Sequence, residues 1–107
     1  MIYNFMRLIL FFDLPMITKK ERKVYSDFHK YLIKNGYLML QYSIYSKIFN
    51  NVDALNNHII ILKRNVPSAG QIRIMSVTEK QFARIDIIVG GKSLHEEKIS
   101  IEPFIIL

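Results

Sequence analysis

Residues 5–13 read FMRLILFFD, an apolar run that is broken only by Arg7 and ends in a single carboxylate. Apolar side chains on both faces are typical of a strand at the centre of a sheet. Asp13 ends this run directly before Leu14-Pro15, a pair that favours a turn. We therefore expect a central first strand that presents one acid at its end.

A helix is expected after this strand. Thr18 and Glu21 have the spacing of a capping box, and Gly36 is a usual C-terminal stop, so the helix should run from Thr18 to about Asn35. Helical spacing predicts a buried face that consists of Val24, Phe28, Tyr31 and Leu32. The opposite side carries lysines within an arc of about 60°, namely Lys19, Lys23, Lys30 and Lys34. This stripe is either an ordinary solvated face or a surface that meets phosphates.

The remaining chain predicts further strands and one more helix. Residues 37–49 are too long for one strand, so we expect strands at 37–41 and 43–49 with a bend near Gln41-Tyr42. A helix at 52–65 should bury its apolar positions Leu55, Ile59 and Leu62. Strands are then expected at 72–78 and 83–89, joined by a short connection at 79–81. Residues 99–105 read as an edge strand or tail.

This order, β-α-β-β-α-β, predicts an α+β fold, a ferredoxin-like sandwich with an extra C-terminal strand. Both helices should cover one face of the sheet. The other face should be bare, with apolar contributions from Tyr42, Ile44, Met75 and Val77. A bare apolar face predicts a homodimer in which two copies cover each other.

Length and composition limit the class of protein. A chain of 107 residues fits one domain, here residues 1–90, with residues 91–107 as a C-terminal extension or edge strand that pairs with the partner subunit. The net charge of +6 favours a polyanionic partner such as nucleic acid. No apolar run approaches the length of a membrane span, and the start lacks the layout of a signal peptide. These features and the absence of cysteine favour the cytoplasm.

Four tracts carry a resemblance to a known family. They read YNFMRLILFFDLP at 3–15, KERKVY at 20–25, GYLMLQYSIYSK at 36–47 and VTEKQFAR at 77–84. In this order they resemble the small CRISPR-associated adaptation protein of the Cas2 family, most closely the form from systems with a single large effector nuclease. The residues after Gly90 match least.

The resemblance implies a cytoplasmic, ferredoxin-like homodimer whose C-terminal strand adds to the partner's sheet. It implies a role in CRISPR adaptation, the acquisition of spacers, in which the dimer bridges two dimers of the CRISPR integrase and supports a short DNA duplex. It also implies a metal-dependent endonuclease, acting on RNA or duplex DNA, in which two copies of Asp13 share a magnesium ion across the dimer. We favour the scaffold, because one acid per chain is few ligands for Mg²⁺.

The candidate site residues divide into three kinds. Asp13 is the tentative catalytic residue and metal ligand; alternatively, it is a turn residue that accepts backbone N–H bonds. The candidate contacts to nucleic acid are Lys19, Lys20, Arg22, Lys23, Lys80 and Arg84. The histidines share no ligand spacing, which favours packed or surface positions for His29, His58 and His95. The tyrosines suit core or dimer packing better than base stacking, and these are Tyr37, Tyr42 and Tyr45.

Three other functions stay open at this point. The first is a metal-dependent endoribonuclease or deoxyribonuclease, whose turnover would require Asp13. The second is a toxin-like ribonuclease of the same fold that needs no integrase and arrests growth when expressed alone. The third is a purely structural homodimer, which would bind duplex DNA no better than its charge explains.

Overall fold

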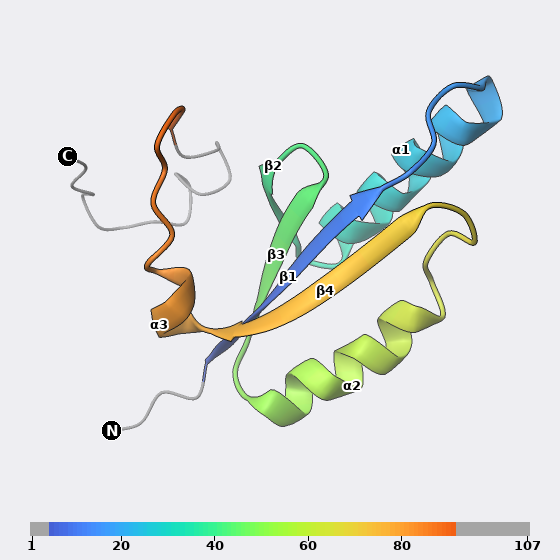
Figure 1. Ribbon diagram of the computed structural model, residues 1–107. Helices are drawn as coiled ribbons and strands as arrows, with labels where there is room; N and C mark the ends of the chain where they lie inside the picture. The colour runs from blue at the N-terminus through green and yellow to red at the C-terminus, as the bar shows by residue number, and fades with distance from the viewer. Residues whose placement is uncertain (1–4, 92–107) are drawn as a thin grey trace.

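The computed structural model describes residues 5–91, in which four strands form one antiparallel sheet (Figure 1). The strands are β1 (Met6–Asp13), β2 (Leu38–Gln41), β3 (Ile44–Phe49) and β4 (Gln71–Thr78), in the order β2-β3-β1-β4. Helix α1 (Lys19–Lys34) connects β1 to β2, and helix α2 (Val52–Lys63) connects β3 to β4. This is the expected ferredoxin-like arrangement, and β1 lies inside the sheet as its apolar sequence predicts.

The two ends of α1 form where the sequence places them. The hydroxyl of Thr18 accepts a hydrogen bond from the Glu21 amide at 3.0 Å, and the Glu21 carboxylate accepts one from the Thr18 amide at 2.9 Å. Gly36 follows the helix with φ of 88°, in the left-handed region that favours glycine. Both predictions, the capping box and the glycine stop, are confirmed.

The core lies between the sheet and the two helices. Alternation along β1 directs Leu8, Leu10 and Phe12 toward the helices, where they meet side chains of both α1 and α2. The predicted buried face of α1 is partly wrong, because Tyr25 is buried and Val24 is 40% exposed. The buried face is centred on Tyr25, Phe28 and Leu32, so Val24 lies about 75° from its centre. The opposite, lysine-bearing face is exposed as expected.

The bend between β2 and β3 falls at Tyr42 and Ser43. Ser43 has φ of 67°, a left-handed conformation that a residue with a Cβ seldom adopts. Its carbonyl accepts a hydrogen bond from the Phe12 amide at 3.2 Å, which ties the turn to the end of β1. The predicted division of residues 37–49 into two strands is therefore confirmed.

The second half of the fold repeats this plan. Helix α2 buries Leu55 and Leu62, while Ile59 packs against the core from a half-buried position.

On the side of the sheet away from α1 and α2, Met75 and Val77 of β4 lie opposite Ile9 and Arg7 of β1. Met75 is 51% exposed, and so the bare face predicted from the sequence is present. The prediction is wrong for Tyr42, whose ring stacks on Tyr25 of α1. No helix within residues 5–91 combines the length and apolar character that crossing a membrane requires.

The predicted fifth strand at 83–89 is wrong for the described chain. A one-turn helix, α3 (Glu79–Phe82), stands in place of the expected connection, and the turn continues through a bond from the Ile85 amide to the Phe82 carbonyl at 3.1 Å. Residues 86–89 then join no strand within residues 5–91. High β-propensity is insufficient when no neighbouring strand is present to accept the backbone hydrogen bonds. The expected strand at 99–105 and most of the 91–107 extension lie outside the described residues.

Candidate nucleic-acid interface

Asp13 lies at the end of β1 that leads into α1, opposite Gln71 of β4. The residue is exposed, and within residues 5–91 no hydrogen bond or ion pair engages its carboxylate. The alternative in which Asp13 accepts backbone N–H bonds in a turn is therefore wrong. The backbone of Gly70 packs tightly against the backbone of Asp13, because a Cβ at Gly70 would lie only 2.6 Å from the Asp13 carbonyl oxygen. Asp13 thus combines a fixed backbone with an available carboxylate.

Two of the four cations near the start of α1 are held by the protein itself. Arg22 donates hydrogen bonds to the carbonyls of Met16 at 3.3 Å and Ile17 at 2.7 Å, so it braces the loop that leads into the helix. Lys23 pairs with the Asp27 carboxylate at 3.1 Å on the exposed face. Lys19 and Lys20 are exposed and engage no acid within the described residues. Of the four predicted cations near the start of α1, these two lysines are the ones that remain available to a phosphate.

Lys80 and Arg84 lie at the other end of the sheet. Both are exposed and belong to α3 and the turn after it, which begins where β4 ends beside the first residues of β1 (Figure 1). Because β1 has eight residues, the two ends are roughly 23 Å apart at about 3.3 Å per residue. One chain therefore does not bring the six predicted cations together. It presents two separate cationic sites, one at each end of β1.

The aromatic residues of the β2–β3 hairpin divide into buried and exposed rings. Tyr37 and Tyr45 are 2% and 1% exposed, which confirms the expected core packing, and burial raises the pKa of each phenol. Tyr42, in contrast, is 65% exposed at the turn. Its ring stacks on Tyr25 of α1 with centroids 5.4 Å apart and planes 20° apart. Burial raises the pKa of Tyr25 to about 12.

The histidines support the core rather than a metal site. His29 Nδ1 lies 2.6 Å from the Tyr45 hydroxyl, and His58 Nε2 lies 2.7 Å from the Tyr37 hydroxyl. Residues 5–91 contain no group of three or more histidine, aspartate or glutamate side chains that could hold a metal ion. The prediction of packed histidines is confirmed for these two, and His95 lies outside the described residues.

The environment of His58 predicts a loss of stability in mild acid. Burial lowers the pKa of His58, and the nearby Lys47 ammonium lowers it further. The folded state therefore favours the neutral ring, and the unfolded state binds more protons once the pH falls below the ordinary histidine value of about 6.5. We expect the free energy of unfolding to decrease as the pH falls from about 7.5 toward 5.5, with this contribution below about 1.4 kcal/mol per pH unit.

Urea titrations at several pH values would measure this effect. His58→Gln keeps a hydrogen-bond acceptor for the Tyr37 hydroxyl but does not titrate, so its unfolding free energy should fall less steeply with decreasing pH. An identical pH dependence for the two proteins would contradict the prediction.

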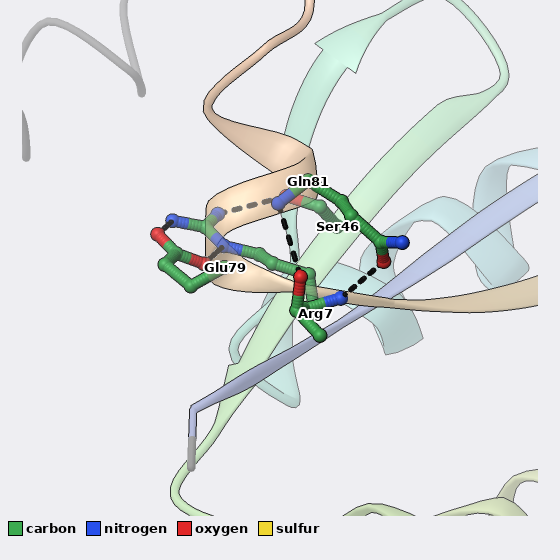
Figure 2. A network of polar contacts seen from close by, with 5 residues as sticks. Arg7, Ser46, Glu79 and Gln81 are labelled. Atoms are coloured by element: carbon green, nitrogen blue, oxygen red, sulfur yellow. Dashed lines mark hydrogen bonds and ion pairs between the residues drawn. The ribbon is translucent and has the colours of Figure 1, made fainter. Parts of the chain in front are cut away.

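Arg7 is a structural residue that our reading of the sequence missed. Its guanidinium binds both oxygens of Glu79, with Nε to Oε1 at 2.7 Å and Nη2 to Oε2 at 2.9 Å, and Nη1 donates to the fully buried Ser46 at 3.3 Å (Figure 2). The same group lies 4.1 Å from the centre of the Phe82 ring. Arg7 thereby joins β1 to β3 and to α3, which carries Lys80. The sequence contained one signal for this role, a single arginine within an apolar strand, since a charge at such a position needs a partner.

Comparisons with known proteins match most of this chain. The family model described as CRISPR associated protein Cas2 matches residues 6–85, from β1 to the turn after α3. A protein of Acidovorax ebreus named CRISPR-associated endoribonuclease Cas2 is 42% identical over 95 residues, which cover 89% of this chain and 93% of the relative. Relatives of the same name from Treponema denticola and Streptococcus mutans are 46% and 47% identical and cover 79% and 81% of this chain, and 84% and 80% of their own lengths.

Proposed function

Because the chain belongs to the CRISPR-associated Cas2 family, we propose that it is a cytoplasmic DNA-binding scaffold of CRISPR adaptation, which supports a short duplex and bridges dimers of the CRISPR integrase. The observation that carries this proposal is the pair of exposed cationic sites at the two ends of β1. Lys19 and Lys20 form one site, and Lys80 and Arg84 form the other. Cations at the ends of a rigid strand suit contacts with successive parts of one sugar-phosphate backbone, and these contacts would not depend on base sequence.

The scaffold acts as a homodimer. The face of the sheet away from α1 and α2 carries large apolar side chains that are about half exposed, among them Ile48 and Met75. Residues 85–89 add further exposed apolar side chains, with Ile88 and Val89 at 91% and 90%. A second copy would cover these surfaces, and a two-fold dimer would present each cationic site twice.

Magnesium-dependent cleavage is a second candidate function, and the free carboxylate of Asp13 favours it. The three relatives above are named endoribonucleases. Magnesium prefers six oxygen ligands and usually takes one or two from carboxylates, so one copy of Asp13 provides few of them. Within residues 5–91 no second acid joins Asp13 in a cluster. The residues fit a magnesium ion only where two copies of Asp13 meet across a dimer, with water and phosphate oxygens as the remaining ligands.

An integration assay separates the two functions. Purified integrase, a short DNA duplex and a repeat-containing target would be combined with no further protein, with the unmodified chain, or with its Asp13→Ala variant. We expect both forms of the chain to stimulate integration equally, because the scaffold depends on cations at the ends of β1. Asp53→Ala is a matched control, since Asp53 is also exposed and belongs neither to a cationic site nor to the surface proposed for the second copy.

Cleavage of RNA and duplex DNA in magnesium would be measured with the same proteins. Stimulation by the unmodified chain alone, with Asp13→Ala still folded and dimeric, would contradict the scaffold and favour chemistry at Asp13. Absence of stimulation by any form, together with growth arrest when the chain is expressed alone, would favour a toxin-like ribonuclease.

The Lys19 and Lys20 pair predicts a specific change in the salt dependence of DNA binding. Each phosphate that a cation neutralises contributes about −0.9 to the slope of log K against log salt concentration. Replacing both lysines by alanine should therefore reduce the steepness of this slope by about 1.8 for each copy of the site that contacts the duplex, and weaken binding to duplexes of any sequence. Anisotropy titrations over a range of salt concentrations would measure the slope.

The double variant Lys63→Ala, Arg64→Ala is the matched control for this prediction. It removes the same charge from exposed positions at the end of α2 that belong to neither proposed cationic site. An equal change in slope for the two double variants would show that net charge alone governs binding, as expected of a purely structural homodimer.

A further inference from the structure

Tyr42 combines a high exposure with a fixed position. Its ring is 65% exposed, yet Tyr25 stacks beneath it and its hydroxyl donates to the sulfur of Met16 at 3.4 Å. Exposed tyrosines usually keep rotational freedom, which a ligand has to remove on binding. Here two contacts hold the ring before any ligand arrives, so it is a pre-organised apolar surface.

The turn that carries Tyr42 is held in a costly conformation. Ser43 has φ of 67°, where glycine is the usual residue. The Ser43 hydroxyl lies 2.9 Å from the Tyr25 hydroxyl, and the Ser43 carbonyl accepts the bond from the Phe12 amide. The turn is therefore fixed to both α1 and β1. Backbone strain that the surroundings maintain is common where a side chain must be presented to a ligand.

The surroundings of Tyr42 indicate the chemistry of this ligand. The Phe12 amide, which bonds to the turn, directly precedes Asp13. Met16, which accepts the bond from the Tyr42 hydroxyl, lies in the loop that leads to Lys19 and Lys20. An apolar ring, a free carboxylate and two free ammonium groups are thus brought to one end of the sheet. Flat apolar faces joined to phosphates are characteristic of nucleotides. Bases inside a duplex have both faces covered, whereas an unpaired base exposes its faces, so an unpaired base suits this ring better than the interior of a duplex.

We propose that Tyr42 is a stacking platform for an unpaired base of a nucleic-acid strand whose phosphates lie against Lys19 and Lys20. This inference rests on the proposed binding of nucleic acid and adds to it a preference for single-stranded segments at this end of the sheet. Stacking of this kind tolerates any base, because every base has an aromatic face. The subsite is part of the described chain and requires no residue beyond position 43.

Binding of a short single-stranded DNA oligomer by the full chain tests the proposal. The oligomer would carry one 2-aminopurine, whose fluorescence is quenched when it stacks, and a blunt duplex of the same sequence would serve as the comparison. Tyr42→Ala should weaken binding of the single strand by about 5- to 150-fold, the range measured for loss of one stacking aromatic residue. Binding of the duplex should change less than about twofold.

Two variants separate stacking from structural effects. Tyr42→Phe keeps the ring and removes the hydroxyl, with its contact to Met16, so it should retain both affinity and quenching. Ile61→Ala removes another exposed apolar side chain, on α2, and should behave like the unmodified chain. Circular dichroism and thermal unfolding would verify that each variant is folded.

The outcomes distinguish the inference from the function on which it rests. Unchanged single-strand affinity and quenching in Tyr42→Ala would overturn the inference and leave duplex binding intact. Equal losses for the single strand and the duplex would also overturn it, since stacking would then not be the cause. If the unmodified chain bound neither DNA, both the inference and the proposed function would be wrong.

Discussion

Replacing Phe12 by alanine is expected to lower the free energy of unfolding by about 3–5 kcal/mol. Phe12 is 7% exposed, and its ring centre lies 5.4 Å from that of Tyr25, 5.2 Å from that of Phe28 and 5.7 Å from that of Tyr45. One side chain thus joins β1 to both α1 and β3. Its removal leaves a cavity among rings whose positions depend on it, and collapse of the cavity would displace these rings.

Chemical denaturation monitored by circular dichroism would measure this loss. Total stabilities of small domains are about 5–15 kcal/mol, so Phe12→Ala could lack a folded baseline. Phe12→Leu retains most of the volume and should cost less than the alanine variant, which provides a second measurement on a folded protein. A loss below about 1 kcal/mol for Phe12→Ala would contradict the role assigned to this ring.

Replacing Arg7 by alanine is expected to lower the free energy of unfolding by about 2–3 kcal/mol. The substitution removes two hydrogen bonds to Glu79, the bond to the buried Ser46 and the contact with Phe82. The side chain of Arg7 is 13% exposed and that of Glu79 is 38% exposed. Because water partly screens Glu79, the cost should lie below the value of about 3–5 kcal/mol that is typical of fully buried pairs.

A matched comparison is available within the same chain. Lys23 and Asp27 form an ion pair at 3.1 Å with side chains 75% and 57% exposed, so Lys23→Ala should cost only about 0.3–0.5 kcal/mol. A double-mutant cycle of Arg7→Ala with Glu79→Gln would isolate the interaction between these two residues. Equal costs for Arg7→Ala and Lys23→Ala would show that the Arg7 network contributes no more than an exposed pair.

Local signals predicted the parts of the fold that depend on neighbours in the chain. The Thr18 and Glu21 capping box and the Gly36 stop defined α1 because their partners lie within a few residues. The apolar run of β1 predicted a central strand for a similar reason, since burial on both faces excludes polar residues. These features require no knowledge of the rest of the molecule.

The errors arose where the outcome depends on distant residues. The predicted buried face of α1 omits Tyr25, yet the Tyr25 hydroxyl is satisfied by Ser43, which is 18 residues away, and the ring can therefore be buried. Arg7 was overlooked because its partner Glu79 is separated from it by 72 residues. Residues 83–89 have the composition of a strand, but within residues 5–91 they have no strand beside them. The composition of a segment does not show which distant residues will lie beside it.

The sequence proposes the members of the candidate site but does not predict their geometry. Asp13 was identified because it ends the first strand, and the structure shows that its carboxylate is free within the described residues. The six cations were identified by charge, but their separation into two sites depends on which ends of the strands meet. The hydrogen bonds of Arg22 to two backbone carbonyls depend on side-chain geometry that the sequence does not show. The pairing of Lys23 with Asp27 is signalled by their i, i+4 spacing in the predicted helix.

The position of β1 in the sheet has a consequence for the synthesis of this protein. β1 emerges first from the ribosome, but its β4 neighbour is complete only at Thr78, a delay of about 3–13 s at ordinary rates of translation. During this interval the nascent chain exposes a short, strongly apolar strand with high β-propensity, which is typical of segments that aggregate. Arg7 is the only charge within residues 5–12, and it therefore also protects the growing chain before Glu79 exists to pair with it.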